Sequence, residues 1–210
     1  MLDAATLKSF QERFHAIRTL DRRDLIPAQE ASRLSIRDAG PGAFFTCLNQ
    51  TWWIREINSY TETSDDFNTL EDYEIHELTC LCLDTGETIY FEWEYDDALE
   101  VSMTKERLSF RNLKDDAGES IDEDDLDQIA GDRDCVVLNG QNFWYEDDWA
   151  AVFNRGGKQE RVYMYEFENE AGSVFLTIEE WQGSGREEYR IYTSVPVNPD
   201  SITLISKGAQ

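Results

Sequence analysis

The chain has 210 residues, is 12% aromatic, and carries 44 acidic against 19 basic residues, a formal charge of −25. Its length and aromatic content allow a buried core, and its charge repels phosphate backbones, so we expect no nucleic-acid binding. No run approaches the length of apolar sequence that spans a bilayer, so no membrane insertion is expected. Charged residues within residues 1–20 oppose a signal peptide, and the sequence therefore predicts a cytoplasmic protein.

Residues 1–39 are expected to form an N-terminal helical segment. Asp3 has the chemistry of an N-cap, and a helix is predicted from Ala4 to Thr19. Its apolar stripe consists of Leu7, Phe10, Phe14 and Ile17. This stripe predicts an amphipathic helix packed on a β core, with a docking helix for a partner as the alternative. Residues 27–34 predict a short second helix with Pro27 in its first turn.

Residues 40–113 have the texture of β-strands and form the first predicted repeat. After Gly86, the apolar side chains of Ile89, Phe91, Trp93 and Tyr95 alternate with mostly polar ones. A period of two is typical of a strand with one buried face. A hairpin over residues 44–60, a strand covered on both faces over residues 73–83 and a further strand from Leu99 complete the expected meander.

Residues 114–134 hold many acidic and few large apolar residues, and predict an acidic linker with one weak helical turn. The strand pattern then restarts over residues 135–206. Asn139-Gly140 predicts a hairpin turn, and Gly172 opens a run that echoes the one after Gly86. The following glutamates, Glu92 and Glu179, differ by one residue in their spacing from these glycines, which a bulge would absorb. A turn is expected at residues 183–185.

The predicted fold is therefore mainly β, with two related antiparallel β-meander units and an N-terminal amphipathic helix. The units form either a sandwich or a pair of small barrels.

The sequence contains no catalytic signature and no cofactor motif, so we expect no cofactor and assign no catalytic residue. His76, Cys80 and Cys82 share a parity on one strand, but the spacing of His76 and Cys80, about 13 Å at ~3.3 Å per residue, is too long for one metal ion. Buried structural thiols are expected instead. Paired glutamates beside aromatic residues, such as Glu179 with Glu180, could line a glycosidase cleft. The solvent face of a strand in an acidic protein gives the same pattern.

Aromatic pairs recur at matching places in the two halves, where they either fill the core or form a contact surface. Neighbouring residues of a strand point to opposite faces, so one member of each pair is expected to face outward. The candidate surface residues are Trp52, Trp53, Phe143, Trp144 and Trp149.

Several segments resemble the bacterial family of domain of unknown function 4178. These are residues 72–78, 85–87 and 90–94, which read DYEIHEL, TGE and YFEWE, and residues 165–167 and 176–181, which read YEF and LTIEEW. The resemblance covers residues 42–205. It implies a bacterial protein and carries no catalytic residue over to this chain.

The functional hypothesis is a non-enzymatic protein-interaction or accessory module, whose acidic surface favours a basic protein partner. Two alternatives stay open: a hydrolase using carboxylates in a cleft between the repeats, and an acidic inhibitor or nucleic-acid mimic. The sequence leaves the oligomeric state open.

Overall fold

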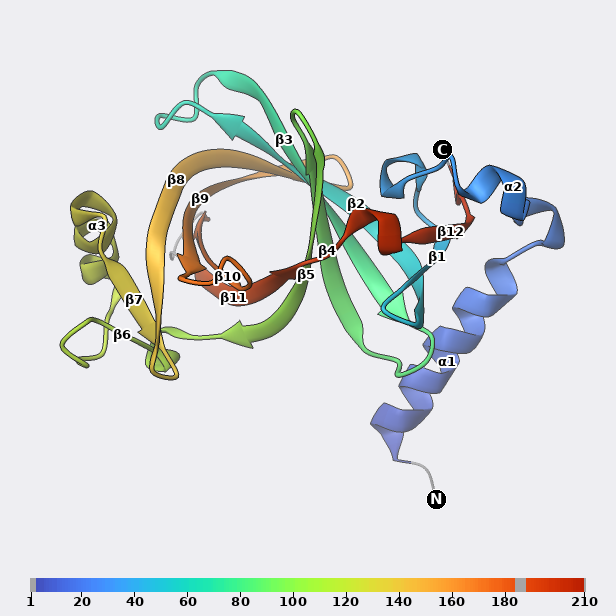
Figure 1. The fold of residues 1–210 in the computed structure, drawn as a ribbon, viewed down its shortest axis with the longest axis horizontal. Coiled ribbons are helices and arrows are strands. Elements are labelled where there is room, and N and C mark those ends of the chain that lie inside the picture. The colour runs from blue at the N-terminus through green and yellow to red at the C-terminus, as the bar shows by residue number, and fades with distance from the viewer. Residues whose placement is uncertain (1–2, 184–187, 210) are drawn as a thin grey trace. The chain divides into compact units, whose positions relative to one another are not determined.

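The computed structural model describes residues 3–183 and 188–209, and the fold is mainly β with antiparallel pairing (Figure 1). Within these ranges, twelve strands follow the hydrogen-bonded order β12-β1-β2-β3-β4-β5-β11-β10-β9-β8-β7-β6, with an additional pairing of β2 to β8. None of the helices in the described ranges has the length and apolar composition that crossing a membrane requires.

The elements have the following bounds. The helices are α1 (Ala4–Thr19), α2 (Ala28–Ala31) and α3 (Glu123–Asp132), and the 3-10 turns are η1 (Arg22–Asp24), η2 (Ile36–Asp38), η3 (Phe110–Asn112) and η4 (Pro199–Ser201). The strands are β1 (Phe44–Cys47), β2 (Gln50–Thr63), β3 (Leu70–Cys82), β4 (Thr88–Tyr95), β5 (Leu99–Leu108), β6 (Leu113–Lys114), β7 (Cys135–Leu138), β8 (Gln141–Arg155), β9 (Lys158–Asn169), β10 (Phe175–Gln182), β11 (Glu188–Pro196) and β12 (Thr203–Ser206).

The chain divides into two compact units. Unit 1 contains residues 1–58, 76–101 and 197–210, and unit 2 contains residues 59–75 and 102–196. Each unit therefore draws on both of the predicted repeats, 40–113 and 135–206. In unit 1, β12 from the C-terminal end of the sequence pairs with β1. In unit 2, β6 from the first half pairs with β7 from the second.

Helix α1 begins and ends where the sequence predicts, because Asp3 caps it: its Oδ1 accepts a hydrogen bond from the Thr6 amide over 2.8 Å. The face that it buries is not the predicted one. Its buried residue is Ala16, which packs with Phe44 and Leu81. The helix also approaches the turn after β3 closely, since a Cβ on Gly86 would lie 2.0 Å from the Ser9 Oγ.

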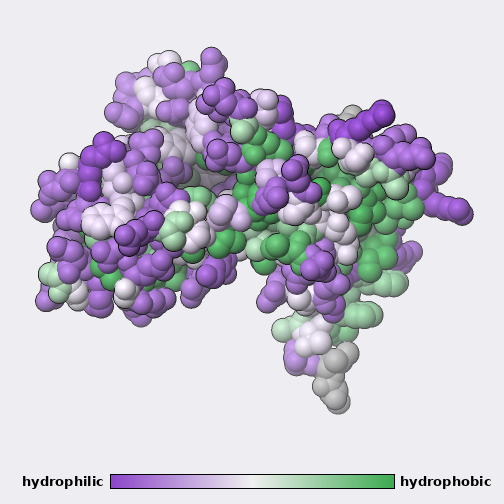
Figure 2. Space-filling view, viewed as in Figure 1, coloured by the Kyte–Doolittle hydropathy of each residue, from purple (hydrophilic) through white to green (hydrophobic). Residues whose placement is uncertain are grey.

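The prediction that the apolar stripe of α1 packs on the β core is therefore wrong. Its side chains are about half exposed: Leu7 45%, Phe10 58%, Phe14 53% and Ile17 54%. Hydrophobic colour is visible on the helix at the lower right of the space-filling view (Figure 2). The physical reason is that small and polar side chains let the helix backbone approach the β3–β4 turn more closely than the phenyl rings would.

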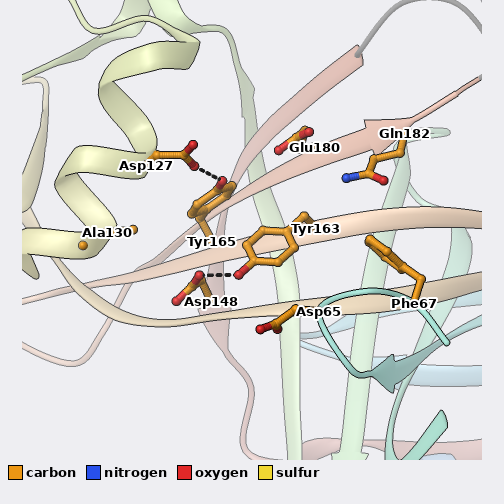
Figure 3. Close-up of a pocket in the computed structure, with 10 residues that line it drawn as sticks. Asp65, Phe67, Asp127, Ala130, Asp148, Tyr163, Tyr165, Glu180 and Gln182 are labelled. Atoms are coloured by element: carbon orange, nitrogen blue, oxygen red, sulfur yellow. Dashed lines mark hydrogen bonds between the residues drawn. The ribbon is translucent and has the colours of Figure 1, made fainter. Parts of the chain in front are cut away.

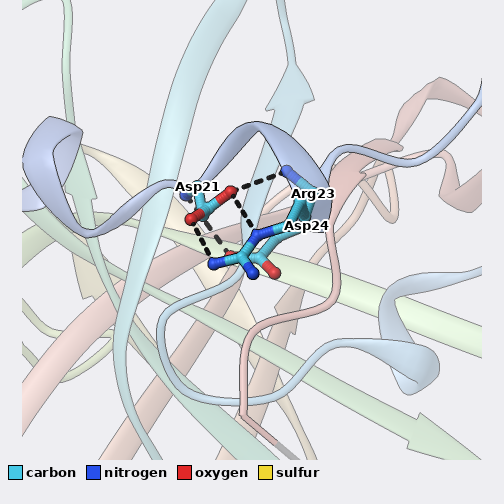
Figure 4. A network of polar contacts seen from close by, with 3 residues as sticks. All are labelled: Asp21, Arg23 and Asp24. Carbon is cyan, nitrogen blue, oxygen red and sulfur yellow. Dashed lines mark hydrogen bonds and ion pairs between the residues drawn. The ribbon is translucent and has the colours of Figure 1, made fainter.

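The 3-10 turn η1 follows α1 and is held by a local polar network (Figure 4). The Asp21 carboxylate accepts hydrogen bonds from the Arg23 amide over 2.9 Å and from the Arg23 guanidinium over 2.8 Å. Asp24 in turn accepts from the Asp21 amide. This reciprocal capping separates α1 from α2. A short helix follows as expected, but it covers only Ala28–Ala31 of the predicted residues 27–34, and Pro27 is its N-cap.

Unit 2 carries apolar residues on both faces of its strands. Along β9, Val162 and Met164 belong to one buried cluster, and Tyr165 and Phe167 belong to another. The first cluster also contains Tyr60 at the end of β2, and the second receives α3 and the short strands β6 and β7. The alternation predicted for these strands is therefore present, but neither face is a plain solvent face.

The segment expected as an acidic linker contains the ten-residue helix α3. Asp122 caps this helix by accepting from the Asp124 amide, and Leu126, Ile129 and Ala130 join a core cluster of unit 2. Three apolar residues at helical spacing are enough to bury one face, and the acidic residues take the solvent side. Two residues of the turn expected at 183–185, Ser184 and Gly185, lie outside the described residues.

A candidate acidic, tyrosine-lined binding site

Unit 2 contains a pocket of about 430 Å³, which we call the acid–tyrosine pocket (Figure 3). Its lining comes from five parts of the unit: α3, the turn between β2 and β3, and the strands β8, β9 and β10. The lining residues are Asp65, Phe67, Asp127, Ala130, Gly131, Asp148, Tyr163, Tyr165, Glu180 and Gln182. Its volume falls in the range of small-ligand sites.

Local structure explains how the aromatic side chains reach this pocket. Tyr163 and Tyr165 are alternate residues of β9, on the same face as the buried Phe167, so both rings project to the side that α3 covers. Tyr163 and Tyr165 lie edge to face, with ring centroids 5.2 Å apart. Phe67 comes from the β2–β3 turn, where its positive φ of 58° bends the chain.

Each tyrosine hydroxyl in the pocket donates to a carboxylate. Tyr165 donates to the Asp127 Oδ1 over 2.6 Å, and Tyr163 donates to the Asp148 Oδ2 over 2.5 Å. The other oxygen of Asp148 accepts from Tyr145. These bonds join β8 and β9 to α3 and fix the direction in which the carboxylates face (Figure 3).

The tyrosines stay neutral at physiological pH. Burial, with the neighbouring Asp148 carboxylate, raises the pKa of Tyr145 to about 12. Burial and the same carboxylate raise the pKa of Tyr163 further, and burial with Asp127 raises that of Tyr165 further still. The phenols therefore act as hydrogen-bond donors with uncharged aromatic faces, and they are poorly suited to act as general bases.

The charge of the pocket is one-sided. Its lining contains four carboxylates, and among the described lining residues there is no lysine or arginine. Two arginines of the same unit stack on aromatic rings: Arg161 lies 5.2 Å from the ring centroid of the lining residue Phe67, and Arg133 lies 5.4 Å from that of Tyr145. The arrangement can attract a positively charged group and offer it both carboxylates and aromatic faces.

A second group of polar residues lies inside unit 2 and is sealed from solvent. Glu179 is 3% exposed and accepts hydrogen bonds from Tyr60 over 2.8 Å, from the Trp181 indole over 2.7 Å and from Tyr192 over 3.1 Å. Burial raises the pKa of Glu179, although these three donors and Arg190 act against that shift. The carboxyl group ties three strands together and is out of reach of a substrate.

Three of the five predicted surface aromatics are in the core: Trp52 is 1% exposed, Phe143 2% and Trp149 7%. They are not surface residues, because their strands are covered on the faces to which they point. Trp53 is half-buried beneath α1 and packs against the cluster around Ala16. Trp144 faces outward as predicted, with 44% of its surface exposed.

Trp144 stands in a shallow hollow of about 590 Å³ between two turns of unit 2. Gln141 and Asn142 from the β7–β8 hairpin and Glu170 from the β9–β10 turn also line this hollow. The hollow therefore offers one exposed indole with amide and carboxylate groups around it, the composition of a protein contact surface.

The cysteines Cys47, Cys80, Cys82 and Cys135 are free thiols and all buried. Burial raises the pKa of Cys47, Cys80 and Cys135, which keeps these thiols protonated. His76 stacks on Trp93 with ring centroids 3.9 Å apart, and no group of three metal-ligating side chains gathers within the ranges that the structure describes.

The acid–tyrosine pocket was not predicted from the sequence. Its carboxylates were indistinguishable from the many others, and Asp127 lies in the segment expected to be a linker. Two signals in the sequence were usable. Tyr163, Tyr165 and Phe167 are alternate residues of β9 and so share one face of the strand, and Leu126, Ile129 and Ala130 have helical spacing. Together they indicate a helix packed over tyrosines.

Comparison with protein families finds one match. The model of a family described as a domain of unknown function (DUF4178) matches residues 40–199. No curated protein and no solved structure is significantly similar to the chain.

Proposed function

Because the chain belongs to the DUF4178 family, which has no described function, we propose its role from the site alone: it is a non-enzymatic protein-interaction module that binds a basic protein partner. As part of this proposal, we place the protein in the bacterial cytoplasm. The observation that carries the proposal is the acid–tyrosine pocket, which has four carboxylates and, in the described lining, no cationic side chain.

Electrostatics supports a basic partner. The formal charge of −25 steers a cationic surface toward the protein from a distance, and the pocket gives that surface a specific place to dock. Complementary charge chiefly speeds association and selects the partner, and aromatic anchors contribute much of the affinity. Trp144 is the anchor we propose for the contact, since it is the exposed tryptophan of unit 2 among the predicted candidates.

We further propose that the two halves of the sequence are related copies. Both hairpins β1–β2 and β7–β8 turn through residues with positive φ, at Leu48-Asn49 and Asn139-Gly140. The loop after β3 closes with a bond from the Cys82 amide to the Glu87 carbonyl, and the loop after β9 closes with the corresponding bond from Asn169 to Val174. Counted from these bonds, Glu92 and Glu179 occupy matching positions, so the one-residue slip lies in the loops.

A carboxylate-dependent hydrolase is the second candidate, favoured by the convergence of carboxylates and tyrosines in one pocket. Three observations weigh against it. Both oxygens of Asp148 accept hydrogen bonds from tyrosines, and the phenols stay protonated at neutral pH and so supply no phenolate to act as a base. The carboxyl group whose pKa is raised by deep burial, Glu179, has its oxygens occupied by three donors in the core.

The test is affinity capture of partners from the native cytoplasm with four forms of the protein. These are the wild type, Trp144→Ala, Asp65→Asn with Glu180→Gln, and Leu70→Ala as the control. Leu70 is 63% exposed in the same unit, so its variant removes a similar apolar side chain elsewhere. We expect one basic protein to be captured by the wild type and by the control, and lost from the other two.

Salt separates charge-steered binding from adsorption. Capture of the basic protein is expected to fall at about 1 M salt, where the screening length is roughly 3 Å. Equal recovery of the same proteins by all four forms would contradict the proposal. Recovery of no protein at either salt concentration would favour the hydrolase, which can then be tested with the same carboxylate variants.

A further inference from the structure

The position in unit 1 that corresponds to the acid–tyrosine pocket is occupied by an arginine of the chain itself. The hydrogen bonds that close the β3–β4 and β9–β10 loops give a common starting point in the two units. Six residues away from these bonds along each strand, His76 pairs with Trp93 in unit 1, and Tyr163 pairs with Glu180 in unit 2. The hairpins β3–β4 and β9–β10 thus have the same register, and in each unit a helical segment comes shortly before the earlier hairpin, β1–β2 or β7–β8.

In unit 1 that helical segment is η2, and it supplies Arg37. The Arg37 guanidinium carbon lies 4.0 Å from the ring centroid of Tyr95 and 6.0 Å from that of Trp93. The ring centroid of His76 lies 3.9 Å from that of Trp93, and the two rings are nearly parallel. Unit 1 therefore holds a guanidinium group on an aromatic surface at this place in the fold.

In unit 2 the helical segment is α3, and it lines the pocket with Asp127, Ala130 and Gly131. Tyr95 of unit 1 is matched by Gln182, which is also a lining residue. Small and acidic side chains thus stand where unit 1 provides an arginine, and the space is an open pocket of about 430 Å³. The rings on which Arg37 stacks, Trp93 and Tyr95, are replaced by Glu180 and Gln182, and the aromatic faces of this pocket are those of Tyr163, which matches His76, and of Tyr165 (Figure 3).

We propose that the acid–tyrosine pocket binds the guanidinium group of an arginine side chain on the partner, in the place that Arg37 takes in unit 1. This inference rests on the proposed function and on the matching hairpin registers. A guanidinium group is planar, stacks on aromatic faces and donates in a fixed fork to carboxylates. A lysine ammonium group is a compact, strongly hydrated point charge, and uses the flat tyrosine faces less well.

The contacts that the pocket offers are consistent with this geometry. The hydroxyls of Tyr163 and Tyr165 are already engaged with Asp148 and Asp127, so the tyrosine rings are held in place and remain neutral. The carboxylates of Asp65 and Glu180 come from opposite sides of these rings, from the β2–β3 turn and from β10. A guanidinium lying on the tyrosine rings would have acceptors at its edges.

The test uses three neutral-capped amino acids as probes: N-acetyl-arginine amide, N-acetyl-lysine amide and N-acetyl-citrulline amide. Citrulline keeps the planar shape of arginine and removes the charge. Binding is followed by nuclear magnetic resonance on the full chain at about 0.15 M salt. We expect saturable shifts centred on Gly131 and Gln182, roughly threefold tighter binding of the arginine than of the lysine probe, and no binding of citrulline.

A variant that fills the pocket supplies the matched control. A Cβ on Gly131 would meet no atom within 4 Å, so a side chain can start there without a clash. Gly131→Arg is expected to place its own guanidinium in the pocket and to abolish binding of the arginine probe. Gly131→Gln brings a neutral chain to the same place and is expected to weaken binding only about twofold.

The outcomes distinguish this inference from the proposed function. Shifts spread over the acidic surface with equal strength for arginine and lysine, or wild-type binding by Gly131→Arg, would overturn it. If Gly131→Arg does not fold, Asp65→Asn with Glu180→Gln decides, and undiminished arginine binding by that variant would overturn it too. Capture of a basic partner that depends on Trp144 would still support the interaction module even when the arginine probe fails.

Discussion

The hydroxyl of Tyr60 donates a hydrogen bond of 2.8 Å to the Oε1 of Glu179, which is 119 residues later in the sequence. Both residues are buried, and the bond joins the end of β2 to β10 within unit 2. Buried carboxyl groups depend on such donors, because an oxygen without a partner in the core costs the full desolvation penalty.

Tyr60→Phe removes one of these donors and keeps the ring. We expect it to lower the free energy of unfolding by about 0.5–1.5 kcal/mol, the net value of one hydrogen bond, because the same oxygen still accepts from Tyr192. Urea denaturation followed by circular dichroism measures this loss. Tyr95→Phe, at a side chain that is 52% exposed, serves as the control and is expected to change stability little. Equal stability of the two variants would contradict the role of the bond.

Glu179→Gln tests the effect of charge at the same site. Burial raises the pKa of Glu179 above its ordinary value of 4.5, so the folded protein binds this proton more tightly than the unfolded chain. The stability that the group contributes is full below the unfolded pKa and is lost as pH rises through the folded pKa. The glutamine variant avoids this loss.

We therefore expect Glu179→Gln to unfold at a higher temperature than the wild type at neutral pH, with the difference disappearing below about pH 4.5. Thermal unfolding of both proteins across this range checks the prediction. A glutamine variant that is less stable than the wild type by the same amount at every pH would contradict it.

Gly86→Ala is expected to displace α1. The added Cβ would lie 2.0 Å from the Ser9 Oγ, and the φ of Gly86 is +82°, a conformation that costs other residues about 1 kcal/mol. Ser9→Ala in the same chain removes the clashing oxygen and should restore most of the lost stability. Gly140→Ala, with φ of +79° and no atom nearby, isolates the backbone cost. A double variant no more stable than Gly86→Ala would show that the contact does not position the helix.

The exposed stripe of α1 should contribute little to stability. Phe10→Ser is expected to change the free energy of unfolding by less than about 0.5 kcal/mol, as for other exposed side chains. Ala16→Leu, on the buried face of the same helix, is expected to cost about 1–3 kcal/mol through overpacking. Thermal unfolding compares the two, and a larger loss at Phe10 would mean that the helix packs through its phenyl rings.

Asp148→Asn should make tyrosine ionisation easier. The Asp148 carboxylate helps to raise the pKa of Tyr145 to about 12, so its removal is expected to lower that pKa toward the ordinary value of 10. Ultraviolet absorbance during an alkaline titration detects the phenolate. Asp96→Asn, in the turn between β4 and β5, removes one charge in unit 1 and is expected to leave the titration unchanged.

The sequence predicted the bounds of helices and turns far better than it predicted which side of each element is buried. The bounds of α1 and the hairpin at Asn139-Gly140 follow from local chemistry, from an N-cap and from a turn that tolerates positive φ, and they are confirmed. The buried face of α1 depends on Gly86, far along the chain, and was predicted wrongly. A local sequence pattern cannot show which distant segment of the chain packs against a helix.

The same limit explains why the burial of several residues of unit 2 and of the aromatic candidates was not predicted. Glu179 has the pattern of a solvent-facing strand residue, and only its donors Tyr60 and Tyr192, from other strands, show that it is buried. Trp52 and Phe143 were candidates because one member of each aromatic pair was expected to face outward, without a signal for which one. In the second pair the outward residue is Trp144, and in the first Trp52 is buried and Trp53 is half-buried.

The pairings of the short strands β12 and β6 bear on how the protein can be divided. β12 lies in the second half of the sequence but completes a hairpin of the first, and β6 lies in the first half but pairs with β7 of the second. A cut between them, near Gly118, would therefore give two fragments that each lack a strand held by the other. Such fragments should regain native structure only when they are mixed, which makes the chain a candidate for a split reporter.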